Sequence, residues 1–148
     1  MSNIERLSER LYKKHKNQVL ALKVMKKLRD DLIKLENRLV DILEVSDNRI
    51  EFRIDDATNE VFYFKLDNHH AEFRIYFEKT PYLQVINPDT KFKLPYVVLK
   101  INNSEELTPL QPNNTPYDYS IHINELVDFV IGVVCFNLDF DKKETVLQ

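Results

Sequence analysis

The residues of this sequence that could do chemistry are few and scattered. His69 and His70 are adjacent, and with Asp67 they could supply two or three ligands to a zinc ion. The stretch 67–70 is polar, however, and it joins two segments of strong apolar alternation, which is typical of a turn. We therefore interpret the histidine pair as part of a turn and predict no metal site there.

Three residues near the C-terminus, Asn137, Asp139 and Asp141, are spaced like the first ligands of a calcium-binding loop. Such a loop also needs a glycine at its sharp turn and a glutamate at its far end, and both are missing here. We therefore interpret this segment as an exposed acidic tail.

Cys135 is the only cysteine. A thiol acts as a nucleophile only with a base beside it. Cys135 lies within the apolar run 129–136, where thiols ordinarily pack as small hydrophobic side chains. A single cysteine also cannot form an internal disulfide, which is typical of a reducing compartment.

Glycine is nearly absent, since Gly132 is the only one. The phosphate-binding loops of nucleotide-binding proteins need several glycines so that backbone amides can approach the anion. Those classes of protein are therefore excluded. We predict that the protein is not an enzyme, has no catalytic residues, and binds neither a cofactor nor a metal.

The sequence opens on charged residues without an apolar signal segment. Its longest apolar run is far shorter than the roughly 20 residues that span a bilayer. We expect a soluble intracellular protein without membrane contact, cytoplasmic, or nuclear in a eukaryote.

The elements that must position any site begin with a long helix. Residues 4–45 contain neither Gly nor Pro, and ten of the twelve a and d positions of a heptad that starts at Ile4 are apolar. This pattern is typical of a coiled-coil seam, so we predict that residues 1–46 form a helical dimerisation arm. The seam residues are Leu7, Leu11, Met25, Leu28, Leu32, Leu35, Leu39 and Ile42.

The seam is weakest at Lys14 and Gln18, where we expect a bend or a polar layer. A straight helix of this length would extend roughly 65 Å and project past a small body. A break near His15 would instead fold the arm back as a hairpin. The pattern leaves these alternatives open, and it does not distinguish a parallel from an antiparallel dimer.

Residues 47–148 are predicted to form a small body, which makes the fold class α+β. Apolar and polar residues alternate over five segments, which predicts an antiparallel meander of about five strands with one exposed face. The predicted strands are 50–55, 60–66, 71–78, 82–86 and 92–101.

After the meander we predict a Pro- and Asn-rich loop at 102–118 and a short strand at 119–123. A helix over 125–138 should pack on the sheet because it is apolar on most sides. The many β-branched residues leave a strand over 129–140 as an alternative. The expected core is Phe52, Ile54, Phe62, Phe64, Phe73, Ile75, Phe77, Leu83, Val85, Leu126, Phe129, Val130 and Val133.

The outward face of the meander combines aromatic, basic and acidic residues, which is typical of a surface that contacts another protein. The predicted partner-binding residues on this face are Arg53, Tyr63, Arg74, Tyr76 and Tyr82. The loop at 102–118 could also display Leu110 and Tyr117 to a partner.

The net charge of −3 conceals an asymmetry. Residues 1–29 hold nine Lys and Arg against two acids, whereas the remainder holds twelve bases against twenty-two acids. Most of the bases lie opposite the apolar seam, so we expect a solvated face that binds nucleic acid weakly and without sequence preference. The lysines that would carry such binding are Lys13, Lys16, Lys23, Lys26 and Lys27.

These features together predict a homodimeric adaptor or regulator that binds an unidentified protein. The helical arm would form the dimer, and the sheet face or the loop at 102–118 would recognise the partner. The alternative is a DNA-binding regulator that uses the basic helix over residues 6–29.

Overall fold

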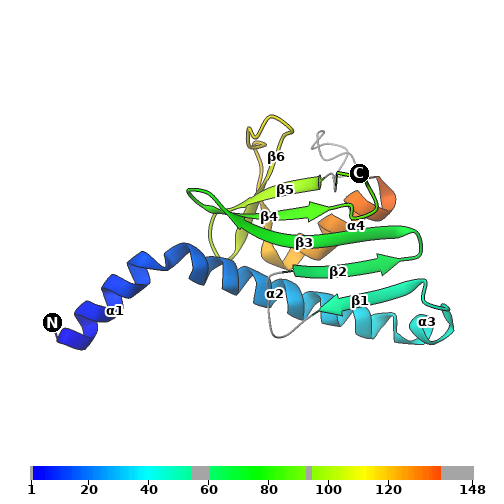
Figure 1. The fold of residues 1–148 in the computed structure, drawn as a ribbon, viewed down its shortest axis with the longest axis horizontal. Helices are drawn as coiled ribbons and strands as arrows, with labels where there is room; N and C mark the ends of the chain where they lie inside the picture. The colour runs from blue at the N-terminus through cyan, green and yellow to red at the C-terminus, as the bar shows by residue number, and fades with distance from the viewer. Residues whose placement is uncertain (1, 55–60, 93–94, 138–148) are drawn as a thin grey trace.

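The computed structural model describes residues 2–54, 61–92 and 95–137, and it has an α+β fold. Three consecutive helices are followed by an antiparallel sheet and a C-terminal helix (Figure 1). No helix among the described residues is long and apolar enough to cross a membrane.

The predicted long helix is divided into α1 (Asn3–Lys14), α2 (Lys16–Arg38) and α3 (Val40–Val45). At His15 the backbone leaves helical geometry, yet the His15 N–H still donates to the Leu11 carbonyl at 2.9 Å. The helix is therefore bent at this point and does not fold back as a hairpin, and α1 projects away from the body (Figure 1). The bend coincides with the weak part of the predicted seam.

The sheet has seven strands in sequence order, and each strand pairs antiparallel with the next. The predicted meander is thus confirmed, but it has seven strands where about five were predicted, because the short strand predicted at 119–123 joins it and residues 106–110 add another. The strands are β1 (Ile50–Ile54), β2 (Val61–Leu66), β3 (His69–Phe77), β4 (Pro81–Ile86), β5 (Pro95–Ile101), β6 (Glu106–Leu110) and β7 (Ile121–His122).

Strand β6 lies in the segment that we predicted to be a loop. Its residues 107–110 are all buried, so it lacks the alternation that marks a half-buried strand. Its hydroxyl group at Thr108 is satisfied, because the Asn102 side-chain amide donates to it at 2.7 Å and the Ser120 hydroxyl lies 2.9 Å away. The paired backbone and the buried apolar side chains make this segment part of the body.

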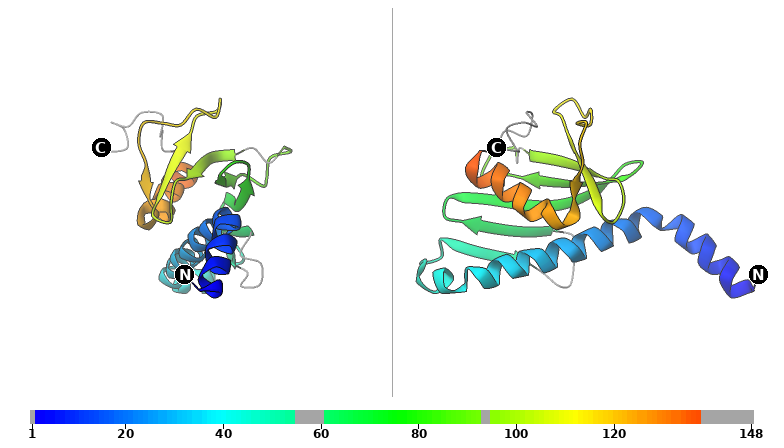
Figure 2. Two further views of the ribbon diagram at one scale, coloured as in Figure 1. Left: turned by 90° about the vertical axis from the view of Figure 1, so that its left-hand side faces the viewer. Right: turned by 180° about the vertical axis from the view of Figure 1, so that it is seen from behind.

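Helices α2 and α4 (Leu126–Phe136) lie on the same side of the sheet, as Figure 2 shows from behind. The core forms between these helices and the inner face of the sheet. It includes Met25, Leu28 and Leu32 of α2, which are almost completely buried. Helix α2 is therefore part of the body, and only α1 projects as an arm, in contrast to the predicted division at residue 46.

The buried faces of the strands largely match the predicted core. Phe62, Phe64 and Phe73 are fully buried. The rings of Phe64 and Phe73 form an edge-to-face contact. Phe52, Ile54 and Ile75 are half-buried at the margin of the core. Phe77 corrects the prediction, because it lies at the end of β3 and is 49% exposed.

Helix α4 resolves the choice between helix and strand for residues 129–136. It ends at Asn137, which adopts a left-handed conformation with φ of 52° and donates its N–H to the Gly132 carbonyl. An asparagine tolerates this conformation and so serves as a helix C-cap. Asp139 and Asp141 of the predicted acidic tail lie outside the described residues.

Candidate binding site on the open sheet face

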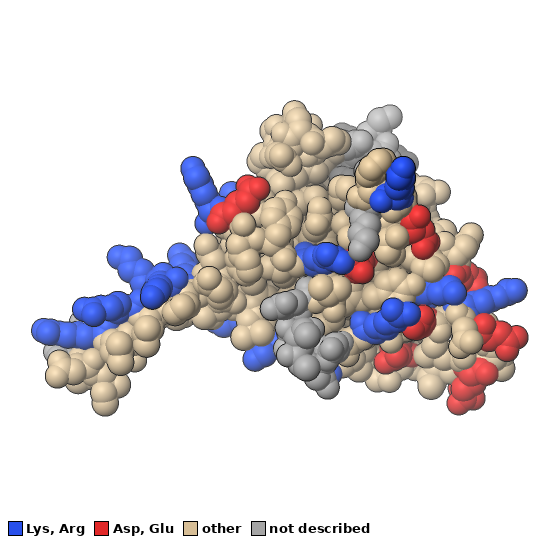
Figure 3. Space-filling model, in the orientation of Figure 1, with Lys and Arg blue, Asp and Glu red and all other residues tan. Residues whose placement is uncertain are grey.

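The face of the sheet opposite α2 and α4 is open, and Figure 3 looks onto it. The predicted residues Arg53, Tyr63, Arg74, Tyr76 and Tyr82 lie together on this face. The strand register pairs Arg53 with Tyr63 and Tyr76 with Tyr82 across neighbouring strands. The Tyr76 and Tyr82 rings stack with centroids 5.1 Å apart.

A groove of about 440 Å³ is hollowed into this face over the first three strands. Its floor comes from β1, β2 and β3, and the turn between β4 and β5 contributes one wall. The lining residues are Arg53, Val61, Tyr63, His70, Glu72, Pro88 and Asp89. This volume suits a few side chains of a ligand or partner.

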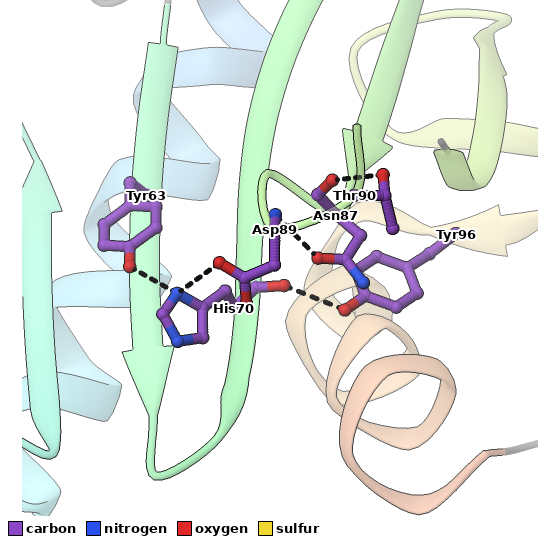
Figure 4. A network of polar contacts seen from close by, with 6 residues as sticks. All are labelled: Tyr63, His70, Asn87, Asp89, Thr90 and Tyr96. Atoms are coloured by element: carbon purple, nitrogen blue, oxygen red, sulfur yellow. Dashed lines mark hydrogen bonds and ion pairs between the residues drawn. The ribbon is translucent and has the colours of Figure 1, made fainter. Parts of the chain in front are cut away.

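Tyr63, His70 and Asp89 form a polar network in the groove (Figure 4). The Tyr63 hydroxyl lies 2.8 Å from His70 Nδ1, and Asp89 Oδ1 lies 3.5 Å from the same nitrogen. Burial raises the pKa of Tyr63, which is already protonated at neutral pH, so its phenol keeps its proton further into the alkaline range. When Nδ1 carries no proton the phenol donates to it, whereas an Nδ1–H would donate to the Tyr63 oxygen or toward the Asp89 carboxylate.

The β4–β5 turn that carries Asp89 is held in shape by its own hydrogen bonds. The Asp89 N–H donates to the Asn87 side-chain oxygen at 3.0 Å, and the Thr90 hydroxyl donates to the Asn87 carbonyl at 3.0 Å (Figure 4). The Tyr96 hydroxyl donates to the His70 carbonyl at 2.9 Å. These contacts fix the wall of the groove relative to its floor.

Two of the three charged residues that line the groove, Arg53 and Glu72, have a partner of opposite charge beside the groove, and the third, Asp89, faces His70. Arg53 contacts Glu51 at 2.7 Å, and its guanidinium lies 5.0 Å from the centre of the Tyr63 ring. Glu72 contacts Arg74 at 2.7 Å. The hydrogen bond from Arg53 is the main cause that lowers the pKa of Glu51. The groove is therefore aromatic and of mixed charge, without a strong excess of either sign.

His69 and His70 do not act together. Both belong to β3, where successive side chains point to opposite faces of the sheet, so only His70 reaches the groove. The turn is formed by the two residues before them, with Asp67 at φ of 57°. Among the described residues, no three His, Cys, Asp or Glu side chains are grouped so as to hold a metal ion.

Cys135 lies on α4, on the covered side of the sheet, and is half-buried. Burial raises the pKa of its thiol, so the reactive thiolate is disfavoured. This placement matches the interpretation of Cys135 as a packing residue.

The loop residues predicted to bind a partner lie elsewhere. Leu110 ends β6 and is buried, so it cannot serve as an exposed anchor. Tyr117 is half-buried, and its ring centroid lies 5.8 Å from that of Tyr119. Neither residue lines the groove.

The predicted seam residues are divided between the core and the surface. Met25, Leu28 and Leu32 are inside the chain's own core, which corrects their assignment to a seam open to a second helix. Leu35 and Leu39 are half-buried. Leu7, Leu11 and Ile42 are exposed near the two ends of the helical segment.

Of the five bases proposed for nucleic-acid binding, Lys13 lies on α1 and the other four lie on the first half of α2. On the face that Figure 3 shows, the charged side chains visible on the projecting arm are Lys and Arg, although α1 also holds Glu5 and Glu9, whereas both signs are interspersed over the body. Lys13, Lys16, Lys23 and Lys26 are exposed. Lys27 is partly buried and contacts Asp31 at 3.0 Å.

No protein-family model matches this chain, and comparisons with curated proteins and with solved structures likewise find no significant match.

The sequence predicted five residues of the open face but not the groove itself. His70 alternates with Glu72 and Arg74, so its strand position could have placed it on the same face. The position of Asp89 has no such signal, because it depends on how the β4–β5 turn lies over β3.

Proposed function

We propose that the chain is a non-enzymatic, homodimeric adaptor or regulator that holds a segment of a partner protein in the groove of the open sheet face. The observation that carries this proposal is the groove over Tyr63 and His70, walled by the ordered turn at Asp89. Tyrosine and arginine are the residues on which protein interfaces most often rely, because each combines a large contact area with hydrogen bonding.

The paired charges favour a protein segment over a nucleic acid. Binding to nucleic acid needs an excess of positive charge to neutralise phosphates. On this face Arg53 and Arg74 are each paired with a glutamate, and Asp89 adds an acid to the groove. A peptide with apolar and mixed polar groups meets fewer unfavourable contacts there.

The homodimer is supported by the exposed apolar residues of α1. Ile4, Leu7 and Leu11 follow one another at helical spacing on one side of a helix that buries no residue in the body. A single helix of this length is marginal in water, so a partner for this stripe is expected.

The groove is tested by selecting binding peptides from a random displayed library and measuring their affinity for three proteins. We expect selected peptides to bind the wild type, to bind Tyr63→Ala at least about tenfold more weakly, and to bind Gln84→Ala unchanged. Gln84 is a matched control because it lies on the same face but outside the groove. Peptides that bind all three proteins equally would overturn the assignment of the groove.

A DNA-binding regulator is the second candidate, because residues 1–29 hold nine bases against two acids. Affinity for a DNA duplex that falls steeply between about 0.05 and 0.2 M salt would support it. A strong preference for one duplex sequence would make the DNA-binding regulator the better supported of the two candidate functions.

A further inference from the structure

The helical segment α1–α3 has exposed apolar residues at both ends. In α1 the exposed fractions are 79% for Ile4, 55% for Leu7 and 45% for Leu11. In α3 they are 48% for Val40, 50% for Ile42 and 77% for Val45. The two helices lie at opposite ends of the molecule, so neither apolar patch can cover the other within one chain (Figure 1).

The two ends also carry opposite charge. Helix α1 holds four bases and two acids, whereas α3 holds two acids and no base. Around the α1 patch the bases include Arg6, Arg10 and Lys14, and around the α3 patch the acids include Asp41 and Glu44. Figure 3 shows bases along the arm and several acids at the opposite end of the body.

The middle of the segment is not free to form a long seam. Met25, Leu28 and Leu32 point into the chain's own core, and Leu22 is the large apolar residue of α2 that remains exposed. A second copy can therefore contact this helical segment mainly at its two ends.

The two patches are related by their spacing. Ile4 and Val45, Leu7 and Ile42, and Leu11 and Val40 form three pairs, and the midpoint of each pair falls between residues 24 and 26 of α2. When two such segments run in opposite directions about a two-fold axis near the middle of α2, the two members of each pair come together, one from each chain.

We propose that two copies of this chain associate antiparallel, so that the basic arm α1 of each copy packs on the acidic α3 end of the other. A parallel pair would place basic arm against basic arm and acidic end against acidic end, which like-charge repulsion disfavours. The two-fold arrangement repeats the same contact twice and closes the assembly at two chains. This inference rests on the homodimer of the proposed function and specifies its direction.

Disulfide cross-linking tests the direction of the dimer. Leu7→Cys and Ile42→Cys are made in separate chains on a Cys135→Ser background, and the two proteins are mixed and oxidised. We expect a covalent dimer containing one chain of each kind, and native light scattering should give the mass of two chains. Leu7→Cys alone serves as the matched control and should form little covalent dimer.

Three other outcomes would overturn the inference. Efficient cross-linking of Leu7→Cys to itself would show a parallel pair, which leaves the proposed homodimer standing. Cross-links between positions 7 and 42 in assemblies larger than two chains would show an open head-to-tail array. A protein that stays monomeric at tens of micromolar would overturn the homodimer itself, and with it this direction.

Charge reversal gives an independent measurement. We expect Arg6→Glu/Arg10→Glu and Asp41→Lys/Glu44→Lys each to weaken the dimer, raising its Kd about tenfold or more, and an equimolar mixture of the two to restore it. Asp118→Lys is the control for a charge change away from the helices and should leave the Kd unchanged. Circular dichroism confirms that each variant is folded. Single variants that dimerise as well as the wild type would contradict the antiparallel contact.

Discussion

Burial sets the protonation state of the tyrosines around the groove and the core. It raises the pKa of Tyr63, Tyr76, Tyr96 and Tyr119 above the ordinary value of 10.0. In the unfolded chain these phenols ionise near pH 10. The folded protein therefore binds more protons than the unfolded chain once the pH passes 10.

This difference predicts a loss of stability in alkali. The contribution of the four phenols is fully present below pH 10, and it is lost as the pH rises through the raised pKa values of the folded state. Urea denaturation at pH 8, 10 and 11, with tyrosinate absorbance followed in parallel, measures it. Tyr63→Phe should show a shallower decline, and a free energy of unfolding that stays flat to pH 11 would contradict the prediction.

Phe64 and Phe77 are a matched pair for testing the inner face of the sheet. Phe64 is fully buried between Phe52 and Phe73, whereas Phe77 is 49% exposed. We expect Phe64→Ala to lower the free energy of unfolding by about 3–5 kcal/mol because it leaves a cavity. Phe77→Ala should cost about 1 kcal/mol or less, since the ring already contacts water. Equal losses in chemical denaturation would show that the burial of Phe64 on β2 or of Phe77 on β3 is misassigned.

At the scale of elements, alternation predicted the first five strands because each has apolar residues packed on or against the core on one face and more polar residues on the other. Strand β6 gave no such signal, since four successive residues are buried and Pro109 lies among them. Proline is uncommon inside a sheet, so its presence favoured a loop. Pairing with β5, which no local pattern encodes, makes this segment a strand.

The heptad of the long helix predicted an apolar stripe correctly but could not say what covers it. Apolar residues at positions a and d serve equally well against a second helix or against the chain's own sheet. For Met25, Leu28 and Leu32 the sheet and α4 provide the cover. The groove depends even more on tertiary structure, because Asp89 reaches His70 only through the β4–β5 turn.

Because Leu28 is buried in the core and Leu7 is exposed, a change to Asp should have different results at these two positions. Leu28→Asp places a charge in the core, where its burial without a partner costs more than most domains of this size can tolerate, so the chain should unfold. Leu7→Asp changes an exposed position and should leave a folded monomer. Circular dichroism and light scattering distinguish the two. A Leu28→Asp protein that is folded but monomeric would instead show that Leu28 lies in a seam between two chains, as the heptad pattern predicted.

At the scale of the whole molecule, the uneven distribution of charge gives the arm two candidate partners, nucleic acid and the acidic end of a second copy of the chain. Six of the nine bases in residues 1–29 are lysines, which offer charge without the planar, two-point recognition of base edges that arginine provides. Nucleic acid should therefore bind the arm through its phosphates alone, and several unrelated duplexes should bind equally weakly at about 0.15 M salt.

If the arms pack on the acidic α3 ends of a second copy, nucleic acid and dimerisation compete for the same bases. Adding duplex DNA at low salt should then shift the protein from dimer toward monomer, because ligands that bind only the free arm stabilise the dissociated state. Sedimentation with a labelled protein measures this shift, and fluorescence anisotropy measures DNA binding. Lys13→Glu/Lys16→Glu should lose the DNA effect, whereas Lys100→Glu, on the sheet, should keep it. DNA that binds tightly without dissociating the dimer would show that DNA binding and dimerisation use different surfaces. Tight binding to one duplex over the others would favour the DNA-binding regulator.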